Sequence, residues 1–309
     1  MKIDGHEIEL SNRDKVFFPE AGLTKGDLID YYEQVAPVMV PHMKHYGVSM
    51  QRFPDGIDGD SFYNKDTPDY FPDWIERINF PKQEGGSFNA PVITSKAGLV
   101  YLANQAVLTP HLYLARKDNL NHPDKMIYDL DPPEDTTDYS VVREAALAIR
   151  QVMQELELEC WVQTTGSKGF HVIIPLDCSA DFDAVREFAK DTARLLVRRE
   201  PDKYTLEQRK SDRKGRVFLD MLRNAYGATA VAPYAVRARE EGPIATPLDW
   251  QEIKDGASPR DWTIESLPRR LAQKDDPWAG IRKHGYSLSG RREQLDELLE
   301  QEEPADEES

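Results

Sequence analysis

The chain has 309 residues, of which 39% are hydrophobic and 30% charged, and its formal net charge at pH 7 is −16. No apolar run approaches the roughly 20 residues that a membrane-spanning helix needs, and the N-terminus lacks a signal-peptide core. Cys160 and Cys178 form no metal-binding or redox spacing. These features exclude an integral membrane protein and predict a soluble, cytoplasmic protein with one large domain or two modest ones.

Acidic and basic residues are unevenly distributed along the chain. Residues 291–309 contain nine acidic and two basic residues, and we expect a disordered tail or a frayed helix there. Residues 198–216 contain eight basic and four acidic residues. Lys and Arg bind nucleic-acid phosphates, so the negative net charge counts against a nucleic-acid partner. The basic segment 198–216 could still bind phosphate locally, and the alternative is that it is a solvated loop.

The N-terminal part is predicted to contain a helix over residues 24–40. Thr24 and Asp27 have the spacing of a helix cap, and apolar residues then recur at helical spacing until Pro41. Residues 48–53 (VSMQRF) predict a strand. Residues 64–98 are rich in Pro, Gly and Asp and predict an irregular stretch with short elements only. Long irregular segments in compact domains are often functional.

From residue 125 onward, strands and helices follow in the order βαββαβ. The expected strands are 125–131, 160–165, 170–176 and 216–222, and the expected helices are 138–157 and 181–198. This order is typical of the split βαβ, ferredoxin-like arrangement, in which strand 125–131 lies between strands 170–176 and 216–222. The predicted fold class is therefore α+β.

The alternation of side chains in these strands predicts a cluster of polar groups. In strand 125–131, Met126, Tyr128 and Leu130 should pack on the helices, so Asp129 and Asp131 share the open face. The same rule leaves Asp220 open on one neighbouring strand and His171 open on the other. Three aspartates and a histidine are thus expected to converge.

Clustered carboxylates repel one another by about 4 kcal/mol per close pair at an effective dielectric constant near 20. Either a raised pKa or bound divalent cations must offset this repulsion, and hard oxygen ligands suit magnesium or manganese. Two such ions can activate a hydroxyl and stabilise a leaving pyrophosphate. The simpler alternative is that Asp129 is a solvated strand residue and Asp131 precedes a turn. Asp220, within the apolar VFLDML segment, favours the metal site.

Two further segments offer groups that could bind phosphate. The turn from Thr165 to Gly169 has glycines that permit tight backbone geometry, and Thr165, Ser167 and Lys168 offer donors. Arg237 and Arg239 would share one face of an extended segment and could neutralise phosphate charge. An ordinary hairpin turn and two surface arginines are the simpler alternatives.

Together these motifs resemble the primase-polymerase domain of the bacterial and archaeal end-joining ligase D, in the archaeo-eukaryotic primase superfamily. The resemblance covers residues 8–255. It is carried, in chain order, by NRDKVFFPEAGLTKGDLIDYY, RFPDGIDGDSFYNKDTPDYFPDWIE, YDLDPPE, TTGSKGFHVIIPL, RVFLDMLRNAYGATAVAPYAVRARE and GPIATPLDW.

The resemblance implies a primase-polymerase fold, in which a ferredoxin- or RRM-like βαββαβ catalytic sheet packs with an N-terminal mixed α/β module. We expect the domain over residues 1–290. Its parts would be the N-terminal module at about 1–120, the catalytic module at about 121–255 and a C-terminal extension at about 256–290, before the acidic tail 291–309.

The resemblance also assigns roles to residues that match the family's motifs. Asp129, Asp131 and Asp220 match its metal-binding aspartates, and His111 matches a histidine near the sugar of the incoming nucleotide. The nucleotide is further expected to contact Thr165, Ser167, Lys168, His171, Arg223, Arg237 and Arg239. For His111, the alternative is a structural histidine in a loop.

Two more sets of residues match DNA-binding positions of the family. Asn12, Lys15 and Lys25 match a pocket for the 5′-phosphate of a downstream strand; otherwise the lysines would be solvated charges. Phe62 and Tyr63 match a pair that stacks on the template base, with core packing as the alternative.

The sequence departs from the family at Thr165, Met221 and Tyr226, where serine, tyrosine and arginine are usual. Thr165 keeps the hydroxyl. Tyr226 lacks the cation, so one contact to nucleic acid or nucleotide is expected to be weaker or replaced.

The function implied by the resemblance is a template-dependent polymerase that adds nucleotides, preferentially ribonucleotides, to 3′ ends at DNA gaps and double-strand breaks in non-homologous end joining. It would use two Mn²⁺ or Mg²⁺ ions with NTP or dNTP substrates. We expect a stand-alone, nucleoid-associated module whose partner is 5′-phosphorylated DNA, with Ku and a separate DNA ligase as further candidate partners. The alternatives are a metal-dependent nuclease or phosphoesterase, and a non-catalytic DNA-end-binding module that recruits a ligase.

Overall fold

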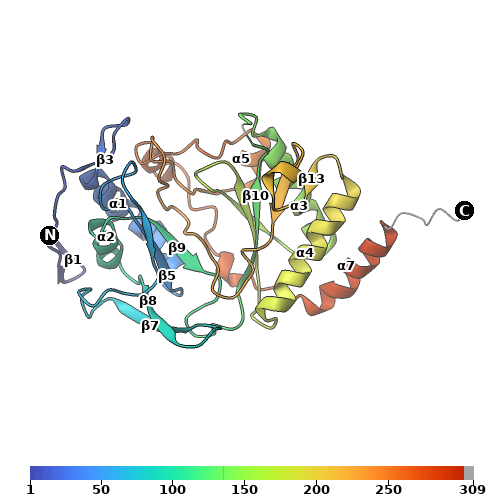
Figure 1. Cartoon of the computed structure of the whole chain (residues 1–309), viewed down its shortest axis with the longest axis horizontal. Coiled ribbons are helices and arrows are strands. Elements are labelled where there is room, and N and C mark those ends of the chain that lie inside the picture. Colours follow the sequence, from blue (N-terminus) through green and yellow to red (C-terminus); the bar gives the residue numbers. More distant parts are fainter. Residues whose placement is uncertain (135, 303–309) are drawn as a thin grey trace, which may run out of the picture.

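Two β-sheets lie side by side with helices on their outer faces in the computed structural model, which describes residues 1–134 and 136–302 (Figure 1). We call them the β9 sheet and the β10 sheet. The β9 sheet has the strand order β15-β9-β5-β6, and the β10 sheet has the order β13-β14-β10-β12-β11-β16. Strand β15 comes from the C-terminal half of the chain, so the two halves are interleaved.

The elements of the N-terminal half surround the β9 sheet. Its strands are β5 (Val48–Arg52), β6 (Phe62–Asn64), β9 (Val107–Tyr113) and β15 (Thr229–Val231), and it packs on α1 (Lys25–Met43) and α2 (Lys96–Asn104). The remaining strands form the pairs β1 (Lys2–Ile3) with β2 (His6–Glu7), β3 (Val16–Phe18) with β4 (Leu23–Thr24), and β7 (Glu76–Pro81) with β8 (Ser87–Val92).

Helix α1 begins as the sequence predicts and ends slightly later. The Thr24 side chain accepts a hydrogen bond from the Asp27 backbone N–H, and the Asp27 side chain accepts one from the Thr24 N–H, which completes a capping box. The helix continues through Pro41 to Met43. A proline this near the C-terminal end removes only one helical donor, so it does not stop the last turn.

Residues 64–98, which the sequence predicts as irregular, contain the β7–β8 hairpin and the start of α2. The six-residue strands pair in register from Glu76 with Val92 to Pro81 with Ser87. The alternation of apolar and polar residues that marks a strand is hard to recognise here, because Phe80 is the single buried side chain of β7. Pro81 and Pro91 also lie inside strands, where proline is uncommon.

The β10 sheet has the topology expected from the βαββαβ order. Its elements are β10 (Lys125–Asp131), α3 (Ser140–Glu155), β11 (Trp161–Thr164), β12 (Phe170–Pro175), α4 (Phe182–Arg199) and β14 (Val217–Asp220). Strand β10 pairs with both β12 and β14, antiparallel. Met126, Tyr128 and Leu130 lie in the core with α3 and α4, as the alternation predicts. The short edge strands β13 (Tyr204–Thr205) and β16 (Pro247–Leu248) were not predicted.

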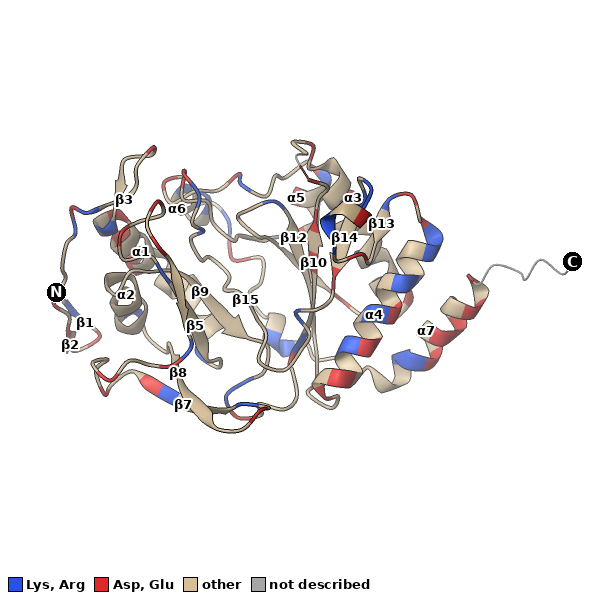
Figure 2. Ribbon diagram, in the orientation of Figure 1, with Lys and Arg blue, Asp and Glu red and all other residues tan. Residues whose placement is uncertain are grey.

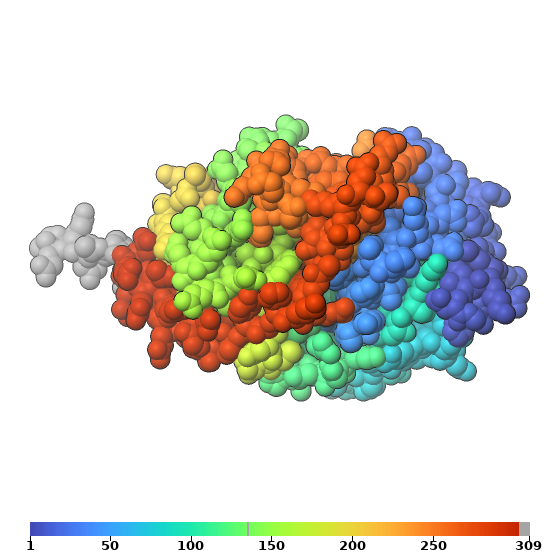
Figure 3. All heavy atoms as spheres, turned by 180° about the vertical axis from the view of Figure 1, so that it is seen from behind, coloured from blue at the N-terminus to red at the C-terminus, as the bar shows by residue number. Residues whose placement is uncertain are grey.

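The C-terminal part runs back across the molecule. It contains α5 (Trp250–Lys254), α6 (Leu267–Leu271), the 3-10 turn η2 (Ile281–Lys283) and α7 (Ser289–Gln301), and another 3-10 turn, η1 (Lys210–Asp212), precedes β14. The orange and red segment crosses the back of the molecule between the blue and green parts (Figure 3).

Helix α7 occupies the first part of the segment in which the sequence predicts disorder or a frayed helix. Leu295 is fully buried, and Arg292 Nη1 lies 2.8 Å from Asp191 Oδ2 of α4. Figure 2 shows the acidic residues of α7 beside basic residues of α4. This part is therefore a docked helix, and residues 303–309 lie outside the described residues. In the described part of the chain, no helix is long and apolar enough to cross a membrane.

Candidate active site

The polar residues predicted on the open face of the β10 sheet do lie side by side. Strand register places Asp129 opposite Asp220 on β14 and opposite His171 on β12. Cross-strand partners in an antiparallel sheet point to the same face, so the three side chains share one surface. Asp131 is two residues further along β10 and pairs with Phe218.

Asp129 is 7% exposed, and its carboxylate contacts the side chains of Arg223 and His171. Its Oδ2 accepts hydrogen bonds from Arg223 Nε (3.2 Å) and Nη2 (3.1 Å), and its Oδ1 lies 3.4 Å from His171 Nε2. Burial raises the pKa of Asp129, but His171 and Arg223 outweigh burial and bring the pKa well below its ordinary value. Asp129 is therefore an ionised carboxylate with its counter-charge already in place.

The other two aspartates have the opposite tendency. Burial and then the charge of Asp129 raise the pKa of Asp131 to about 6, against Arg213, whose Nη1 lies 3.8 Å from Asp131. Burial also raises the pKa of Asp220, although its carboxylate accepts a hydrogen bond of 2.7 Å from the Leu222 N–H. Neighbouring carboxylates thus compete for the ionised state, which a bound cation would relieve.

The metal site predicted from these aspartates is supported by the type of donor atoms that they offer, and less by how their side chains are arranged. Within residues 1–134 and 136–302, no group of three His, Cys, Asp or Glu side chains is arranged to hold a metal ion. Instead, Arg223 neutralises Asp129 and Arg213 faces Asp131. Three neighbouring hard oxygen donors still match the preference of Mg²⁺ and Mn²⁺. The assignment of metal ligands stays a prediction.

The turn between β11 and β12 has the tight geometry that its glycines suggest. A Cβ atom on Gly169 would lie 1.9 Å from the Leu130 carbonyl oxygen, so another residue cannot fit there without moving β10. The Thr165 hydroxyl accepts hydrogen bonds from the Ser167 N–H (3.3 Å) and the Gly169 N–H (3.2 Å). The Thr165 hydroxyl therefore stabilises the conformation of the turn. Lys168 is the exposed side chain of the turn.

The predicted arginines meet this turn from the other side. Arg237 Nη1 donates to the Thr165 carbonyl (2.9 Å), and Arg239 Nη2 lies 3.5 Å from Ser167 Oγ. Arg260, which was not predicted, donates to the Ser167 carbonyl (2.6 Å). No motif marks Arg260 in the sequence, because its partner is 93 residues away. The turn thus gathers cations beside the acidic face.

His111 lies within β9 and not in a loop. It is 7% exposed, its Nδ1 is 3.2 Å from the Thr109 carbonyl oxygen, and its ring centroid is 5.5 Å from that of Tyr63. Burial and then the charge of Arg237 lower the pKa of His111 to about 3, so the imidazole is neutral at physiological pH. A neutral imidazole can donate or accept a hydrogen bond without adding charge.

Phe62 and Tyr63 lie on the edge strand β6 and are surface residues. Their exposed fractions are 45% and 56%, so the alternative that they pack in the core is wrong. The Arg52 guanidinium lies 5.6 Å from the centroid of the Phe62 ring. Exposed aromatic rings beside a cation form a surface on which a base could stack.

Asn12, Lys15 and Lys25 come together near the start of α1. The Lys25 N–H donates to the Lys15 carbonyl (2.8 Å), and the Lys15 N–H donates to the Asn12 carbonyl (3.1 Å). Lys25 is 5% exposed, and its ammonium group donates to the Ser11 carbonyl (2.7 Å) and hydroxyl (3.2 Å). Burial and then the charge of Lys15 lower the pKa of Lys25. This ammonium has no carboxylate bonded to it in the described residues.

Two residues of the β14 motif have roles that sequence reasoning missed. Asn224 is fully buried, and its amide bonds both the N–H (2.8 Å) and the C=O (2.7 Å) of Ile127 on β10. Tyr226, which departs from the arginine that the resemblance leads us to expect, donates to the Pro81 carbonyl (2.8 Å) and contacts the rings of Phe80 and Phe182. Tyr226 thus connects the β7–β8 hairpin to the start of α4. Met221 is buried in the core beneath β14.

Comparisons with known proteins agree on one family. A family model described as "LigD, primase-polymerase domain" matches residues 24–278. The multifunctional non-homologous end joining protein LigD of Mycolicibacterium smegmatis is 35% identical over 250 residues, which are 80% of this chain and 32% of that protein. LigD of Mycobacterium tuberculosis is 32% identical over 277 residues, covering 87% of this chain and 36% of that protein. The chain thus spans about a third of the length of these curated relatives.

A solved structure has the same fold. The polymerase domain of Mycobacterium tuberculosis ligase D in complex with DNA superimposes with a TM-score of 0.84 at 30% sequence identity. The match covers 91% of this chain and 99% of that chain. The α+β primase-polymerase fold expected from the sequence is therefore confirmed.

Proposed function

This chain belongs to the LigD primase-polymerase family, and we propose that it is a template-directed nucleotidyltransferase that adds nucleotides to 3′ ends at DNA gaps and double-strand breaks. The observation that carries the proposal is the register that joins Asp129, Asp220 and His171 on one face. The similarity to a polymerase domain in complex with DNA supports DNA as the substrate.

In the proposed reaction, the 3′-hydroxyl of a primer attacks the α-phosphorus of a nucleoside triphosphate and pyrophosphate leaves. Asp129, Asp131 and Asp220 would hold two Mg²⁺ or Mn²⁺ ions, which lower the pKa of the attacking hydroxyl and stabilise the charge of the leaving group. For this to occur, Arg223 must release Asp129, and it can then pair with phosphate. Arginine suits that exchange because its planar guanidinium binds carboxylate and phosphate in the same bidentate way.

The triphosphate would be positioned by the turn between β11 and β12. Lys168 and His171 would contact the phosphates together with Arg237 and Arg239, which bond the turn at Thr165 and Ser167. Neutral His111 would bond the sugar of the incoming nucleotide. The exposed pair Phe62 and Tyr63 would stack on the template base.

The group of Asn12, Lys15 and Lys25 would bind the 5′-phosphate of the downstream strand. A buried ammonium without a bonded carboxylate is suited to an anion, because an incoming phosphate supplies the missing charge. Recognition of a 5′-phosphate would direct the enzyme to gaps and breaks. Ku and a DNA ligase are the protein partners that we propose for end joining on the nucleoid.

Primer extension on a gapped duplex tests the proposal. We expect Asp129→Ala and Asp220→Ala to abolish extension with Mg²⁺ or Mn²⁺ while binding to 5′-phosphorylated gapped DNA is largely retained. Glu297→Ala removes an exposed carboxylate on α7 and is the matched control. Extension by the aspartate variants at the parent rate would refute the mechanism. A primer that shortens without ever lengthening would indicate a nuclease, and binding without either change would indicate a recruiting module.

A further inference from the structure

A cavity of about 580 Å³ lies between the two sheets and the C-terminal segment. Its walls come from β9, β15, the first half of β10, β12, Gln163 of β11, and residues 276–286, which we call the C-terminal strap. Its volume is within the range of sites for small organic ligands. Of the residues assigned above to metal or nucleotide, His171 is the one that lines this cavity in the described structure. The cavity thus adjoins the predicted catalytic face at His171, but neither the turn at Thr165 nor the three aspartates line it.

The strap is fastened at both ends and carries η2 across the cavity. Asp276 lies 2.7 Å from His42 Nε2 and accepts a hydrogen bond of 2.6 Å from Tyr234. Trp278 Nε1 donates to the Val162 carbonyl (3.0 Å), and the Tyr286 N–H donates to the Pro175 carbonyl (3.1 Å). The match to the family ends at residue 278, so η2 lies beyond it.

The inner end of the cavity has apolar walls and one unpaired polar atom. Leu114, Ile173 and Trp278 line it. Gln163 is 2% exposed, and its Nε2 contacts His171 Nδ1 (3.3 Å) and the Val231 carbonyl (3.4 Å). Its Oε1 has no hydrogen-bond partner in the described residues. Buried carbonyl oxygens normally accept a hydrogen bond, so this atom indicates a ligand that carries a donor.

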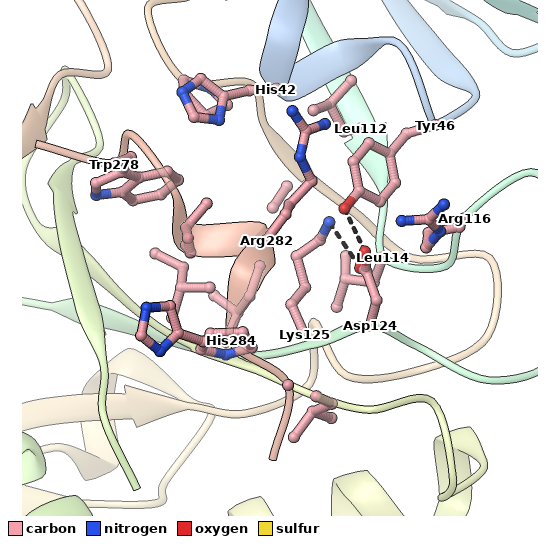
Figure 4. Close-up of a pocket in the computed structure, with 18 of the residues that line it drawn as sticks. His42, Tyr46, Leu112, Leu114, Arg116, Asp124, Lys125, Trp278, Arg282 and His284 are labelled. Atoms are coloured by element: carbon pink, nitrogen blue, oxygen red, sulfur yellow. Dashed lines mark hydrogen bonds and ion pairs between the residues drawn. The ribbon is translucent and has the colours of Figure 1, made fainter. Parts of the chain in front are cut away.

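The outer end of the cavity carries two cationic side chains of η2, Arg282 and Lys283. The other charged lining residues are Arg116 and Lys125, which pair with Asp118 and Asp124, and Asp177. Arg282 extends from η2 into the cavity toward Tyr46, and Lys125 and Asp124 form an ion pair beside it (Figure 4). The side chains of Arg282 and Lys283 form no hydrogen bond or ion pair with any residue among 1–134 and 136–302. Burial and then the charges of Arg116 and Arg282 lower the pKa of His45.

We propose that this cavity is a second ligand site that binds a phosphorylated nucleoside of mononucleotide size. Its phosphate would contact Arg282 and Lys283, and its base would lie against Trp278 and donate a hydrogen bond to Gln163 Oε1. The combination of a cationic outer end, apolar walls and an unpaired inner acceptor matches such a molecule at each point. The site does not depend on the polymerase activity proposed above.

Binding of uridine 5′-monophosphate to the full chain, measured by calorimetry without metal or DNA, tests this proposal. Two matched ligands separate the contacts: uridine lacks the phosphate, and 3-methyluridine 5′-monophosphate lacks the N–H donor. We expect each to bind at least about tenfold more weakly than the parent ligand, as the loss of one charged or buried hydrogen bond predicts.

Variants then locate the site. Arg282→Ala should weaken binding of uridine 5′-monophosphate by about tenfold or more, whereas Arg269→Ala, an exposed arginine on α6, should leave it unchanged. Lys168→Ala should also leave it unchanged, because Lys168 belongs to the catalytic face. Absence of binding at millimolar concentration would overturn the proposal. Binding that Lys168→Ala abolishes and Arg282→Ala does not would overturn it as well, because the ligand would then occupy the catalytic face.

Discussion

Asn224→Ala is the substitution for which the structure predicts the clearest loss of stability. Strands β10 and β14 pair only from Asp129 to Asp131 in the described ladder, and the chain turns away after Asp220. Beyond that point, the Asn224 side chain makes the hydrogen bonds to β10 that a neighbouring strand would make. Its amide oxygen accepts from the Ile127 N–H, and its amide NH₂ donates to the Ile127 and Met221 carbonyls, at 2.7–2.9 Å.

The expected magnitude follows from these contacts. Asn224 is 0% exposed, so water cannot replace its amide without entering the core. Alanine would leave the Ile127 N–H and carbonyl buried and unpaired, at a cost of about 1–3 kcal/mol for each unsatisfied group. With partial relaxation, we expect the free energy of unfolding to fall by about 2–4 kcal/mol. Ile127 is two residues from Asp129, so primer extension should decline together with stability.

Urea denaturation followed by tryptophan fluorescence measures this change. Asn79→Ala is the matched control, because Asn79 lies on the exposed β7–β8 hairpin and its amide bonds the Ser87 hydroxyl. Its free energy of unfolding should change by less than about 0.5 kcal/mol. If Asn224→Ala were as stable as Asn79→Ala, the idea that a side chain continues the β10 ladder would be refuted.

Three further results are expected. Lys25→Met should weaken binding to 5′-phosphorylated gapped DNA about tenfold in a filter-binding assay and leave binding to the 5′-hydroxyl form unchanged; equal losses on both substrates would contradict a phosphate contact. Tyr63→Ala should raise the Kd for templated DNA by a factor that corresponds to about 1–3 kcal/mol, and an unchanged Kd would rule out stacking. Burial raises the pKa of Asp276, but hydrogen bonds and charge from His42, and then Tyr234, outweigh burial and hold the pKa below its ordinary value. The ionised carboxylate therefore contributes stability above the pKa of the unfolded state, about 3.9, and this contribution is lost as pH falls below that value. The stability difference between the parent and Asp276→Asn should therefore shrink from pH 6 to pH 3 in urea titrations, and a difference independent of pH would contradict this linkage.

The convergence of the three aspartates and His171 was predictable because it depends on local rules. Period-two alternation assigns Asp129 and Asp220 to the face away from the helices, and the βαββαβ order makes their strands neighbours. The capping box at Thr24 and Asp27 is likewise encoded within four residues. Such features need no knowledge of distant segments.

Contacts between distant segments were not predictable in the same way. Arg223 meets Asp129 across 94 residues, and Arg260 meets Ser167 across 93. The docking of α7 depends on a buried leucine and an ion pair with α4, which the acidic composition of the segment conceals. The hairpin at β7 and β8 has prolines within its strands, so its alternation was hidden as well.

The sequence by itself determined the family, the α+β class and the face on which the three aspartates lie, since each follows from periodicity and motif order. Only the tertiary structure decided how those aspartates are neutralised, because their counter-charges, Arg213 and Arg223, reach them through folding and not through strand pattern. It also decided that Phe62 and Tyr63 face solvent and that Gln163 and the strap line the same cavity. Exposure and enclosure depend on which segments pack together, and no single segment encodes that.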